Sequence, residues 1–514
     1  MNERIETSPR RALLIAAPVF ALALLLAFLL RMPHLRGPLD DPHSWRQCET
    51  SEVTRGFVRG GIDLLAPQVS WLGAHRTLVF EFPLPEAMAA AIGRSAGFDP
   101  LWDRLVALGF TVIATFYLFL ATREIAGPDV ARVATVLFAF VPLLQFYSRA
   151  AHVDPCALAG AHGLLFHALR AARGGGATHM IAGAVMGSMA AMVKGPYLAP
   201  VLGPLVFLLA RGDSRGRLAG ALPVVISAIV FIAWRRQVSA INSLAPDWSW
   251  LPGYYKEVDP WWWYVGAWAD RFDPGAWRTL AQRLTLEVAT PLGALVGLIA
   301  LVRRPLPGTP PGARAALVFW LLATAAYLLV FFPLNVRHNY YQLPFAAPVA
   351  VAMGLGIVAV AGESQGRRRW LAKALCLAVI ALACVMPARR GYYRIDEVRV
   401  RAGEVLDRSI PRGALIIAVD RGSEFTDPRL LHRADRHGWA VKPEDITESL
   451  LERLRAEGAT HIGWVSEPGS DRLIPPAFLA SRESVREALF SHEAGKQRLL
   501  AEVHVFTLVA SEQP

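Results

Sequence analysis

Eleven apolar runs dominate the sequence, and they constrain what the chain can fold into. A helix needs about 20 apolar residues to cross roughly 30 Å of hydrocarbon. The runs are 12–30, 104–122, 130–147, 155–170, 178–193, 197–210, 217–234, 286–302, 315–332, 342–361 and 370–387. They predict a polytopic α-helical membrane protein with about 11 spans. The first run follows Arg11, and no small-residue cleavage site precedes Arg31, so we expect an uncleaved span rather than a signal peptide.

The composition agrees with a membrane protein. Hydrophobic residues make up 54% of the chain and charged residues 18%, against roughly 25% charged residues in soluble proteins. The four cysteines form no disulfide framework, and Cys376 and Cys384 cannot bridge each other within one straight helix. The net charge of +11 could indicate a nucleic-acid partner. From residue 388 onward, however, 19 basic residues face 20 acidic ones, so the positive excess lies in the apolar part.

The positions of the basic residues predict how the chain is oriented. If the N-terminus is cytoplasmic, the inner connections hold about 17 Lys and Arg. The short outer connections then hold one each, namely Arg149, Lys194 and Arg337. This asymmetry follows the positive-inside rule. An odd number of spans places the tail outside the cytoplasm, and we expect a multi-pass protein of the plasma membrane.

Two domains are predicted. Residues 1–387 form the transmembrane domain, with large outer loops at 31–103 and 235–285, and residues 388–514 form an extracytoplasmic α/β domain. Within the first loop, 84–92 is expected to be a helix near the membrane surface. In the tail we expect strands at 414–420, 461–465 and 503–509 and a helix at 447–457.

The second outer loop is rich in aromatic residues. They are Trp248, Trp250, Tyr254, Tyr255, Trp261, Trp262, Trp263, Tyr264 and Trp268. Such side chains favour the headgroup level of a membrane, so an interfacial anchor is the simplest interpretation. A wall or lid over a lipid or sugar ligand is the alternative.

Polar residues near membrane spans are costly and therefore indicate function. They gather here in four connections on the predicted outer side, namely 40–47 with 76–84, 149–154, 194–197 and 337–342. Each cluster also has a structural explanation. Asp41 and Asp154 each precede a proline and fit a helix N-cap, Lys194 can extend to the headgroups, and Arg337 and His338 can form a solvated turn. No ligand-spacing motif supports a metal site of His43, His152 and His338.

The order and wording of these clusters resemble the GT-C polytopic glycosyltransferases of the protein O-mannosyltransferase and aminoarabinose-transferase superfamily. The resemblance runs from the first span to about residue 350. Its motifs are the acidic pair Asp40-Asp41, HSWRQ (43–47), EFP (81–83), SRAAHVD (148–154), VKGP (193–196) and HNYYQLP (338–344). A soluble tail is usual in the bacterial members, which makes a bacterial inner membrane the expected location.

The resemblance implies an activity and roles for the matching residues. The donor would be a sugar on a polyprenyl phosphate, and the acceptor an extracytoplasmic lipid, glycan or protein. The catalytic base falls on Asp40 or Asp41, and Asp154 and Glu81 are further acidic candidates. Phe82 stands where the aminoarabinose transferases usually have a lysine. The residues expected to bind substrate and donor phosphate are His43, Arg46, Arg76, Arg149, Lys194, Arg337, His338, Tyr340 and Tyr341.

Other functions remain open at this point. A transporter or flippase of a lipid-linked sugar would also have many spans and a basic pocket, although transporters usually place substrate residues near the midplane. In a third interpretation the tail is a binding module on an inert anchor. No nucleic-acid partner and no certain cofactor is expected, and a divalent metal remains open. The sequence does not identify the sugar, the acceptor, the stereochemistry, the oligomeric state or the role of the tail.

Overall fold

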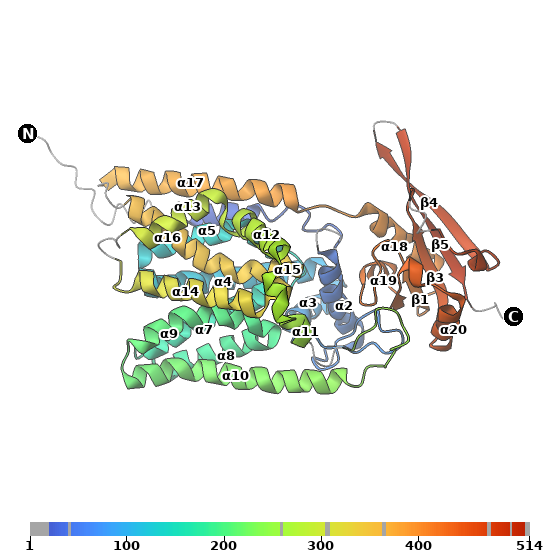
Figure 1. Ribbon diagram of the computed structural model, residues 1–514, viewed down its shortest axis with the longest axis horizontal. Coiled ribbons are helices and arrows are strands. Elements are labelled where there is room, and N and C mark those ends of the chain that lie inside the picture. Colours follow the sequence, from blue (N-terminus) through green and yellow to red (C-terminus); the bar gives the residue numbers. More distant parts are fainter. Residues whose placement is uncertain are drawn as a thin grey trace, which may run out of the picture. The chain divides into compact units, whose positions relative to one another are not determined.

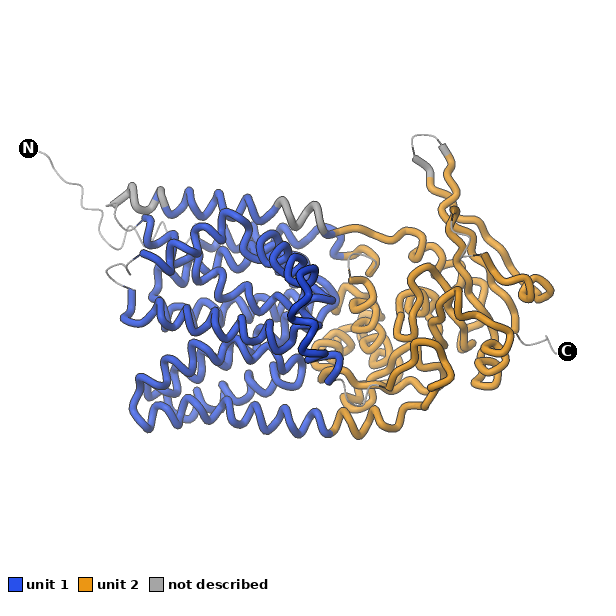
Figure 2. Tube along the Cα trace, in the orientation of Figure 1, with its two compact units in different colours: residues 1–35, 104–236, 260–392 blue, residues 36–103, 237–259, 393–514 orange. Residues whose placement is uncertain are grey.

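The computed structural model describes residues 20–39, 43–256, 261–303, 309–361, 366–469, 474–493 and 496–508. The chain divides into two compact units, which Figure 2 colours along the trace. Unit 1 comprises 1–35, 104–236 and 260–392, and unit 2 comprises 36–103, 237–259 and 393–514. Each unit is therefore built from three separate stretches of the sequence.

Unit 1 is a bundle of apolar helices (Figure 1). Its helices are α4 (Leu101–Ala126), α5 (Pro128–Phe140), α6 (Pro142–Tyr147), α7 (Asp154–Ala172), α8 (Gly176–Lys194), α9 (Leu198–Ala210), α10 (Ser214–Asn242), α11 (Trp261–Tyr264), α12 (Pro274–Arg283), α13 (Pro291–Val302), α14 (Ala313–Val330), α15 (Phe332–Arg337), α16 (Ala346–Ala361) and α17 (Gly366–Gly391). The first three residues of α4 and the last six of α10 belong to unit 2.

Several of these helices are long and apolar enough to cross a membrane. Within the described residues there are five, or up to six if one pair bent by 86° counts as a single span. The five are Leu101–Ala126, Gly176–Ala210, Ser214–Asn242, Ala313–Val330 and Asn339–Ala361. Shorter apolar helices cover Phe20–Leu29 and Lys373–Val385. A mostly helical, multi-pass architecture is therefore confirmed, whereas the count of 11 spans stays a prediction.

Two predicted spans are interrupted in the structure. The run 130–147 becomes α5 and α6, because Val141 leaves the helical region (φ −52°, ψ 124°) before Pro142, which has no N–H to donate. The run 286–302 contains the end of a π-helical turn, η3 (Leu284–Ala289), and then α13. Thr290 (φ 59°) separates these two and precedes Pro291. Both breaks occur at an X-Pro step inside an apolar run.

Unit 2 contains a five-stranded mixed sheet in the order β2-β1-β3-β5-β4 (Figure 1). The strands are β1 (Leu415–Val419), β2 (His437–Ala440), β3 (Ala459–Ser466), β4 (Ser484–Glu493) and β5 (Lys496–Thr507). Strand β1 pairs in parallel with β2 and β3, and β5 pairs antiparallel with β3 and β4. The helices of the tail are α18 (Glu397–Ser409), α19 (Arg429–Ala434) and α20 (Glu448–Ala456). The three predicted strands and the predicted helix are present, and β2 and β4 are additional.

The first outer segment folds with the tail rather than as a membrane loop. It carries α2 (Ser44–Gly60) and α3 (Leu84–Ala96), and α3 contains the predicted helix 84–92. Gly73 N donates to Gly438 O, and Gly438 N donates to Ser70 O, both at 2.8 Å. Segment 70–73 thereby covers the outer side of β2, an edge strand. The predicted boundary at 387/388 lies close to the 392/393 boundary, but the outer segments group with the tail.

The hydrophobic core of unit 2 explains this grouping. Val69, Trp71, Leu72 and Leu78 from the first outer segment are buried in one cluster with the inner faces of the sheet. Trp248 and Leu251 from the second outer segment join them. A loop that buries large apolar side chains in a core gains free energy from that contact and folds with it.

The interfacial anchor predicted for the aromatic segment is therefore wrong for its first half. Trp248 is buried 5.7 Å from the Trp439 ring, and Tyr254 lies edge-on 5.0 Å from Phe425. These aromatics complete a soluble-type core. In the second half, Trp261, Trp262 and Trp268 are exposed, so only this part retains the character of a surface anchor.

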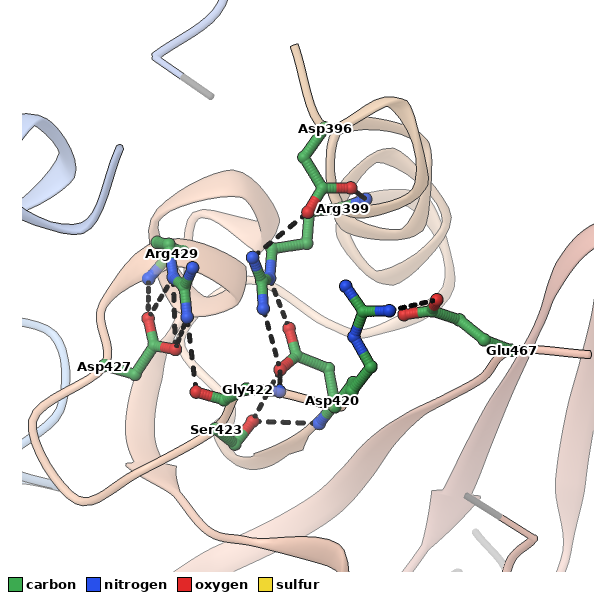
Figure 3. Close-up of polar contacts among 9 residues, drawn as sticks. Asp396, Arg399, Asp420, Gly422, Ser423, Asp427, Arg429 and Glu467 are labelled. Carbon is green, nitrogen blue, oxygen red and sulfur yellow. Dashed lines mark hydrogen bonds and ion pairs between the residues drawn. The ribbon is translucent and has the colours of Figure 1, made fainter. Parts of the chain in front are cut away.

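A network of ion pairs lies at the carboxyl end of β1 (Figure 3). Arg399 of α18 reaches Asp420, directly after β1, with an Nε–Oδ2 distance of 2.6 Å. Arg429 pairs with Asp427 at 2.6 Å, and Arg421 approaches Glu467, directly after β3, at 3.5 Å. These contacts tie α18 and the loop after β1 to the sheet.

Candidate functional site

Two of the predicted polar clusters come together inside unit 1 where helices begin and end. Helix α7 starts at Asp154 and has Pro155 in its first turn. Helix α8 ends at Lys194, whose backbone (φ −158°, ψ 73°) is far from helical, and Gly195–Tyr197 then form the 3-10 turn η1. Because Gly-Pro cannot continue a regular helix without strain, the break places the Lys194 side chain at a helix terminus.

Asp154 and Lys194 form a buried ion pair. Lys194 Nζ lies 3.0 and 3.1 Å from the two carboxylate oxygens of Asp154. Asp154 also contacts His152 Nδ1 and accepts a hydrogen bond from the Tyr197 hydroxyl. Asp154 is fully buried and Lys194 is 6% exposed. The N-cap role considered for Asp154 is wrong, because its side chain caps no backbone N–H and instead faces this cluster.

Aromatic rings surround the Lys194 ammonium group. Its Nζ lies 4.7 Å from the centroid of the Tyr340 ring and 4.4 Å from that of Tyr341. The Tyr197 ring is 5.5 Å away. The negative faces of aromatic rings attract a cation, and more strongly where water is excluded. Lys194 is therefore held in a fixed place and does not extend to headgroups.

The 337–341 motif adds a stacked wall next to this ion pair. The ring of His338 stacks on Tyr340 at 5.0 Å with an interplanar angle of 8°. The Arg337 guanidinium lies over Trp263 at 4.3 Å, and Trp263 lies 6.1 Å from His338. The solvated turn considered for Arg337 and His338 is therefore a packed aromatic wall. Trp263 is the aromatic-segment residue that contacts a predicted site residue here.

A second group of polar residues, absent from the sequence-based list, adjoins the tyrosines. Tyr147 donates its hydroxyl hydrogen to Asn339 Oδ1 at 2.6 Å, and Asn339 Nδ2 donates to Glu287 Oε2 at 2.5 Å. Tyr392 donates to the same Glu287 oxygen at 2.6 Å. Glu287 lies in the π-helical turn η3, a feature frequent at functional sites. An acid within a predicted apolar span was the signal that could have identified it.

Arg149 contacts a different part of unit 1. Its Nη1 donates to the carbonyl of His34 at 3.2 Å, and Arg104 donates to the same carbonyl at 3.0 Å. The Arg149 side chain is fully buried and its guanidinium lies 5.3 Å from the Phe146 ring. These contacts hold the chain where the first described helix ends, and the predicted phosphate-binding role of Arg149 stays a prediction.

The site residues of the first outer segment belong to unit 2. Arg46 of α2 pairs with Glu49 and, at 2.6 Å, with Glu81 of the EFP motif. His43 adopts a left-handed backbone (φ 59°) at the start of α2. Arg76 is exposed on a hairpin in which Gln68 bridges Thr77, and its charge lowers the pKa of nearby His437. Asp40 and Asp41 lie outside the described residues.

Two buried carboxyl groups in unit 2 are chemically unusual. Burial raises the pKa of Glu86 in α3 to about 8, and it has the same effect on Glu52 in α2. Both groups are therefore largely neutral at pH 7. Among the described residues, no group of three or more His, Cys, Asp or Glu is arranged to hold a metal ion.

The fold and these clusters define a class, a polytopic membrane protein of the GT-C-like fold. Residues 83–235 match the family model of dolichyl-phosphate-mannose-protein mannosyltransferases. No curated protein sequence matches the chain.

Solved structures show the same fold. The chain resembles apo ArnT from Cupriavidus metallidurans with a TM-score of 0.56 and 13% identity, over 97% of this chain and 99% of that one. For the apo oligosaccharyltransferase of Archaeoglobus fulgidus the TM-score is 0.57 at 12% identity, over 88% and 69% of the two chains. For the mycobacterial arabinofuranosyltransferase AftD it is 0.60 at 15%, over 95% and 40%. The resemblance to GT-C glycosyltransferases drawn from the motifs is thus confirmed at the level of the fold.

Proposed function

We propose that the chain is a membrane glycosyltransferase that moves a sugar from a polyprenyl-phosphate donor to an extracytoplasmic lipid, glycan or protein acceptor. The observation that carries this proposal is the buried Lys194–Asp154 pair within its ring of tyrosines. A buried charge pair in an apolar helix bundle is costly to maintain and is typical of a functional site.

The reaction needs a base and a group that stabilises the departing phosphate. The acceptor hydroxyl oxygen attacks the anomeric carbon, the bond from that carbon to the phosphate oxygen breaks, and the polyprenyl phosphate departs with the bonding electrons. The hydroxyl proton goes to a carboxylate, for which Asp41 or Asp40 is the proposed residue. Positioned general bases typically contribute 10²- to 10⁴-fold to such steps.

Lys194 is the proposed cation beside the departing phosphate. Asp154 and the tyrosine rings fix the position of its ammonium group, so that little reorganisation is needed when negative charge develops. Arg337, held over Trp263 on the neighbouring motif, is the proposed second cation. Together they replace the lysine that Phe82 displaces from the superfamily pattern.

Known relatives of the fold support a lipid-linked donor. A structure of ArnT from Cupriavidus metallidurans bound to undecaprenyl phosphate matches this chain with a TM-score of 0.55 over 98% of its length. The archaeal oligosaccharyltransferase AglB is known in complex with a dolichol-phosphate and an inhibitory peptide. By analogy we propose that this chain binds a polyprenyl phosphate, with its site on the outer side of the bacterial inner membrane, as the positive-inside pattern predicts.

Mass spectrometry of envelope lipids and glycans tests the proposal. In cells that lack the gene we expect one sugar mass to disappear from one acceptor class and the polyprenyl-linked sugar to accumulate. A chain that restores the missing mass identifies the sugar and the acceptor together. An unchanged envelope with accumulated donor on the inner leaflet would instead favour a flippase. Assays with and without EDTA test the metal requirement that the sequence leaves open.

A further inference from the structure

A pocket lies in unit 2 between α2 and the segment that leads into α3. It encloses about 280 Å³ of space, part of which opens to solvent. Its lining residues are Arg46, Glu49, Thr50, Val53, Pro67, Leu78, Phe80, Glu81, Pro83 and Glu86. Ligand pockets for drug-sized molecules usually measure about 300–1,000 Å³, so this one suits a single small ring.

The charges that line the pocket nearly cancel. Arg46 is the single basic residue of the lining, and it pairs with Glu49 and with Glu81. No positive charge is left in the lining to attract a phosphate group. A polyprenyl chain is equally unsuited, because it is long and entirely apolar. The lining therefore favours a compact neutral molecule.

Two lining side chains point buried polar atoms at this pocket and lack a partner among the described residues. They are Glu86 Oε2 and Thr50 Oγ1. Glu86 is 5% exposed and Thr50 is 3% exposed. Buried polar atoms without hydrogen bonds cost about 1–3 kcal/mol each, and a bound ligand that supplies the bonds removes this cost.

Glu86 is suited to donate such a bond. Burial raises its pKa to about 8 against the attraction of Arg46, and the charges of Glu81 and Asp103 raise it further. At pH 7 the carboxyl group is therefore mainly protonated and offers one O–H donor besides its acceptor oxygen. Thr50 offers the same combination from the facing helix α2.

The remaining walls are apolar. Val53, Leu78 and Phe80 line them together with Pro67 and Pro83. A sugar ring presents hydroxyl groups around its rim and C–H groups on its faces. This pocket matches that distribution, with apolar walls and a few fixed polar groups that set the orientation of a ligand.

We infer that this pocket binds one neutral, hydroxylated sugar ring, with Glu86 and Thr50 as hydrogen-bonding partners of its hydroxyl groups. The inference rests on the proposed function and deepens it, because it assigns a sugar subsite to the first outer segment. The proposed catalytic residues of unit 1 are not part of this pocket.

Saturation-transfer NMR on the purified full chain tests the subsite. The probes are methyl α-mannopyranoside, methyl β-glucopyranoside and methyl α-arabinopyranoside at pH 7. We expect at least one of them to receive saturation on its ring protons. Glu86→Leu and Thr50→Val should each weaken binding about tenfold, the effect of one hydrogen bond to a buried group. Glu86→Gln should retain most of the signal, because its amide still donates and accepts.

Glu52→Gln is the matched control. Glu52 is also a buried glutamate whose pKa is raised to about 8, but it does not line the pocket. Its variant should therefore keep the sugar signal. If Glu86→Leu does not fold, Thr50→Val on the other helix decides the question.

Two results would overturn the subsite: no saturation of any probe by the wild-type chain, or full binding in both Thr50→Val and Glu86→Leu. A failure of the proposed function is distinguishable from either result. In that case the wild-type chain binds a probe through Glu86 and Thr50 but transfers no sugar from any polyprenyl-phosphate donor.

Discussion

Lys194 and Asp154 are each other's main charge partner in a water-poor bundle. Removing one of them leaves the other charge buried, which typically costs about 3–5 kcal/mol. We therefore expect Lys194→Met to lower the melting temperature of the purified chain markedly. Adding Asp154→Asn should restore much of the stability but none of the sugar transfer. A single variant as stable as the wild type would show that the pair is not buried as described.

Glu52 predicts a pH dependence of stability in unit 2. Its pKa is raised from 4.5 to about 8 by burial, against the lowering effects of Ser70 and Arg55, while Glu49 raises it. His432, which faces it, stays neutral because burial lowers its pKa. The folded state thus binds the Glu52 proton more tightly than the unfolded state. The stability that this proton provides is complete below about pH 4.5 and is lost as the pH rises through about 8.

Melting curves from pH 5 to 9 measure this effect. Glu52→Gln should flatten the pH dependence and should melt at a higher temperature than the wild type above pH 8. The expected difference is on the order of a few kcal/mol. Glu457→Gln, an exposed residue at the end of α20, should leave the curve unchanged. Identical curves for Glu52→Gln and the wild type would refute the burial of Glu52.

At the scale of elements, the chain contains links that join the first outer segment to the tail. Asp435, at the end of α19, pairs with Arg55 at 2.8 Å and with Arg59 at 2.6 Å, both from α2. These pairs lower the pKa of Asp435, so their contribution is present near neutrality and lost as the pH falls below about 4. Asp435→Asn keeps a residue that tolerates the left-handed backbone (φ 50°) but removes the charge.

Hydrogen exchange of the α2 amides tests this link. In Asp435→Asn we expect faster exchange in α2, equivalent to a loss of about 1–3 kcal/mol, because Arg55 loses a charged partner. Exchange in α20, which has no part in these pairs, should not change. Equal protection of α2 in the variant and the wild type would show that the link does not stabilise it.

Gly73 tests the cover over edge strand β2. It has φ +54°, and an added Cβ would lie 2.4 Å from the Trp439 ring. Gly97 also has a positive φ (+86°), but nothing lies within 4 Å of an added Cβ there. We expect both alanine variants to lower the melting temperature, Gly73→Ala by clearly more, since only it disturbs Trp439. Equal effects would mean that backbone strain alone is responsible.

Local sequence patterns predicted most helices of unit 1 and little of their partners. Long apolar runs identify helices because a bilayer requires them, but the breaks at Val141 and Thr290 depend on single X-Pro steps. Cluster order brought Asp154 and Lys194 to one site. Tyr197 and Glu287 were missed, because a tyrosine in an apolar run and an acid at its edge have no distinctive spacing.

Pairing between distant segments was beyond the sequence. Strand β2 is only four residues long and contains a glycine, so its alternation is too short to detect. The contact of Gly438 with segment 70–73 joins residues more than 360 positions apart. Such contacts depend on tertiary packing, which one sequence does not display.

At the scale of the whole molecule, the outer segments and the tail share one hydrophobic core. Removing residues 393–514 should therefore expose Trp71, Leu78 and Trp248 and unfold segment 43–103, with loss of activity. Limited proteolysis of membranes should cut this segment in the truncated chain and spare it in the full chain. Resistance of the segment after truncation would show that it folds without the tail, and would leave the tail as a separate binding module.

The central claim is that this chain transfers sugar from a polyprenyl phosphate with a first-loop aspartate as base. The most direct test is transfer from a radiolabelled polyprenyl-phosphate sugar by the purified chain in proteoliposomes, compared among the wild type, Asp41→Asn and Asp40→Asn. We predict turnover by the wild type and a 10²- to 10⁴-fold loss in at least one variant, with donor binding retained. Full turnover in both variants would contradict the account.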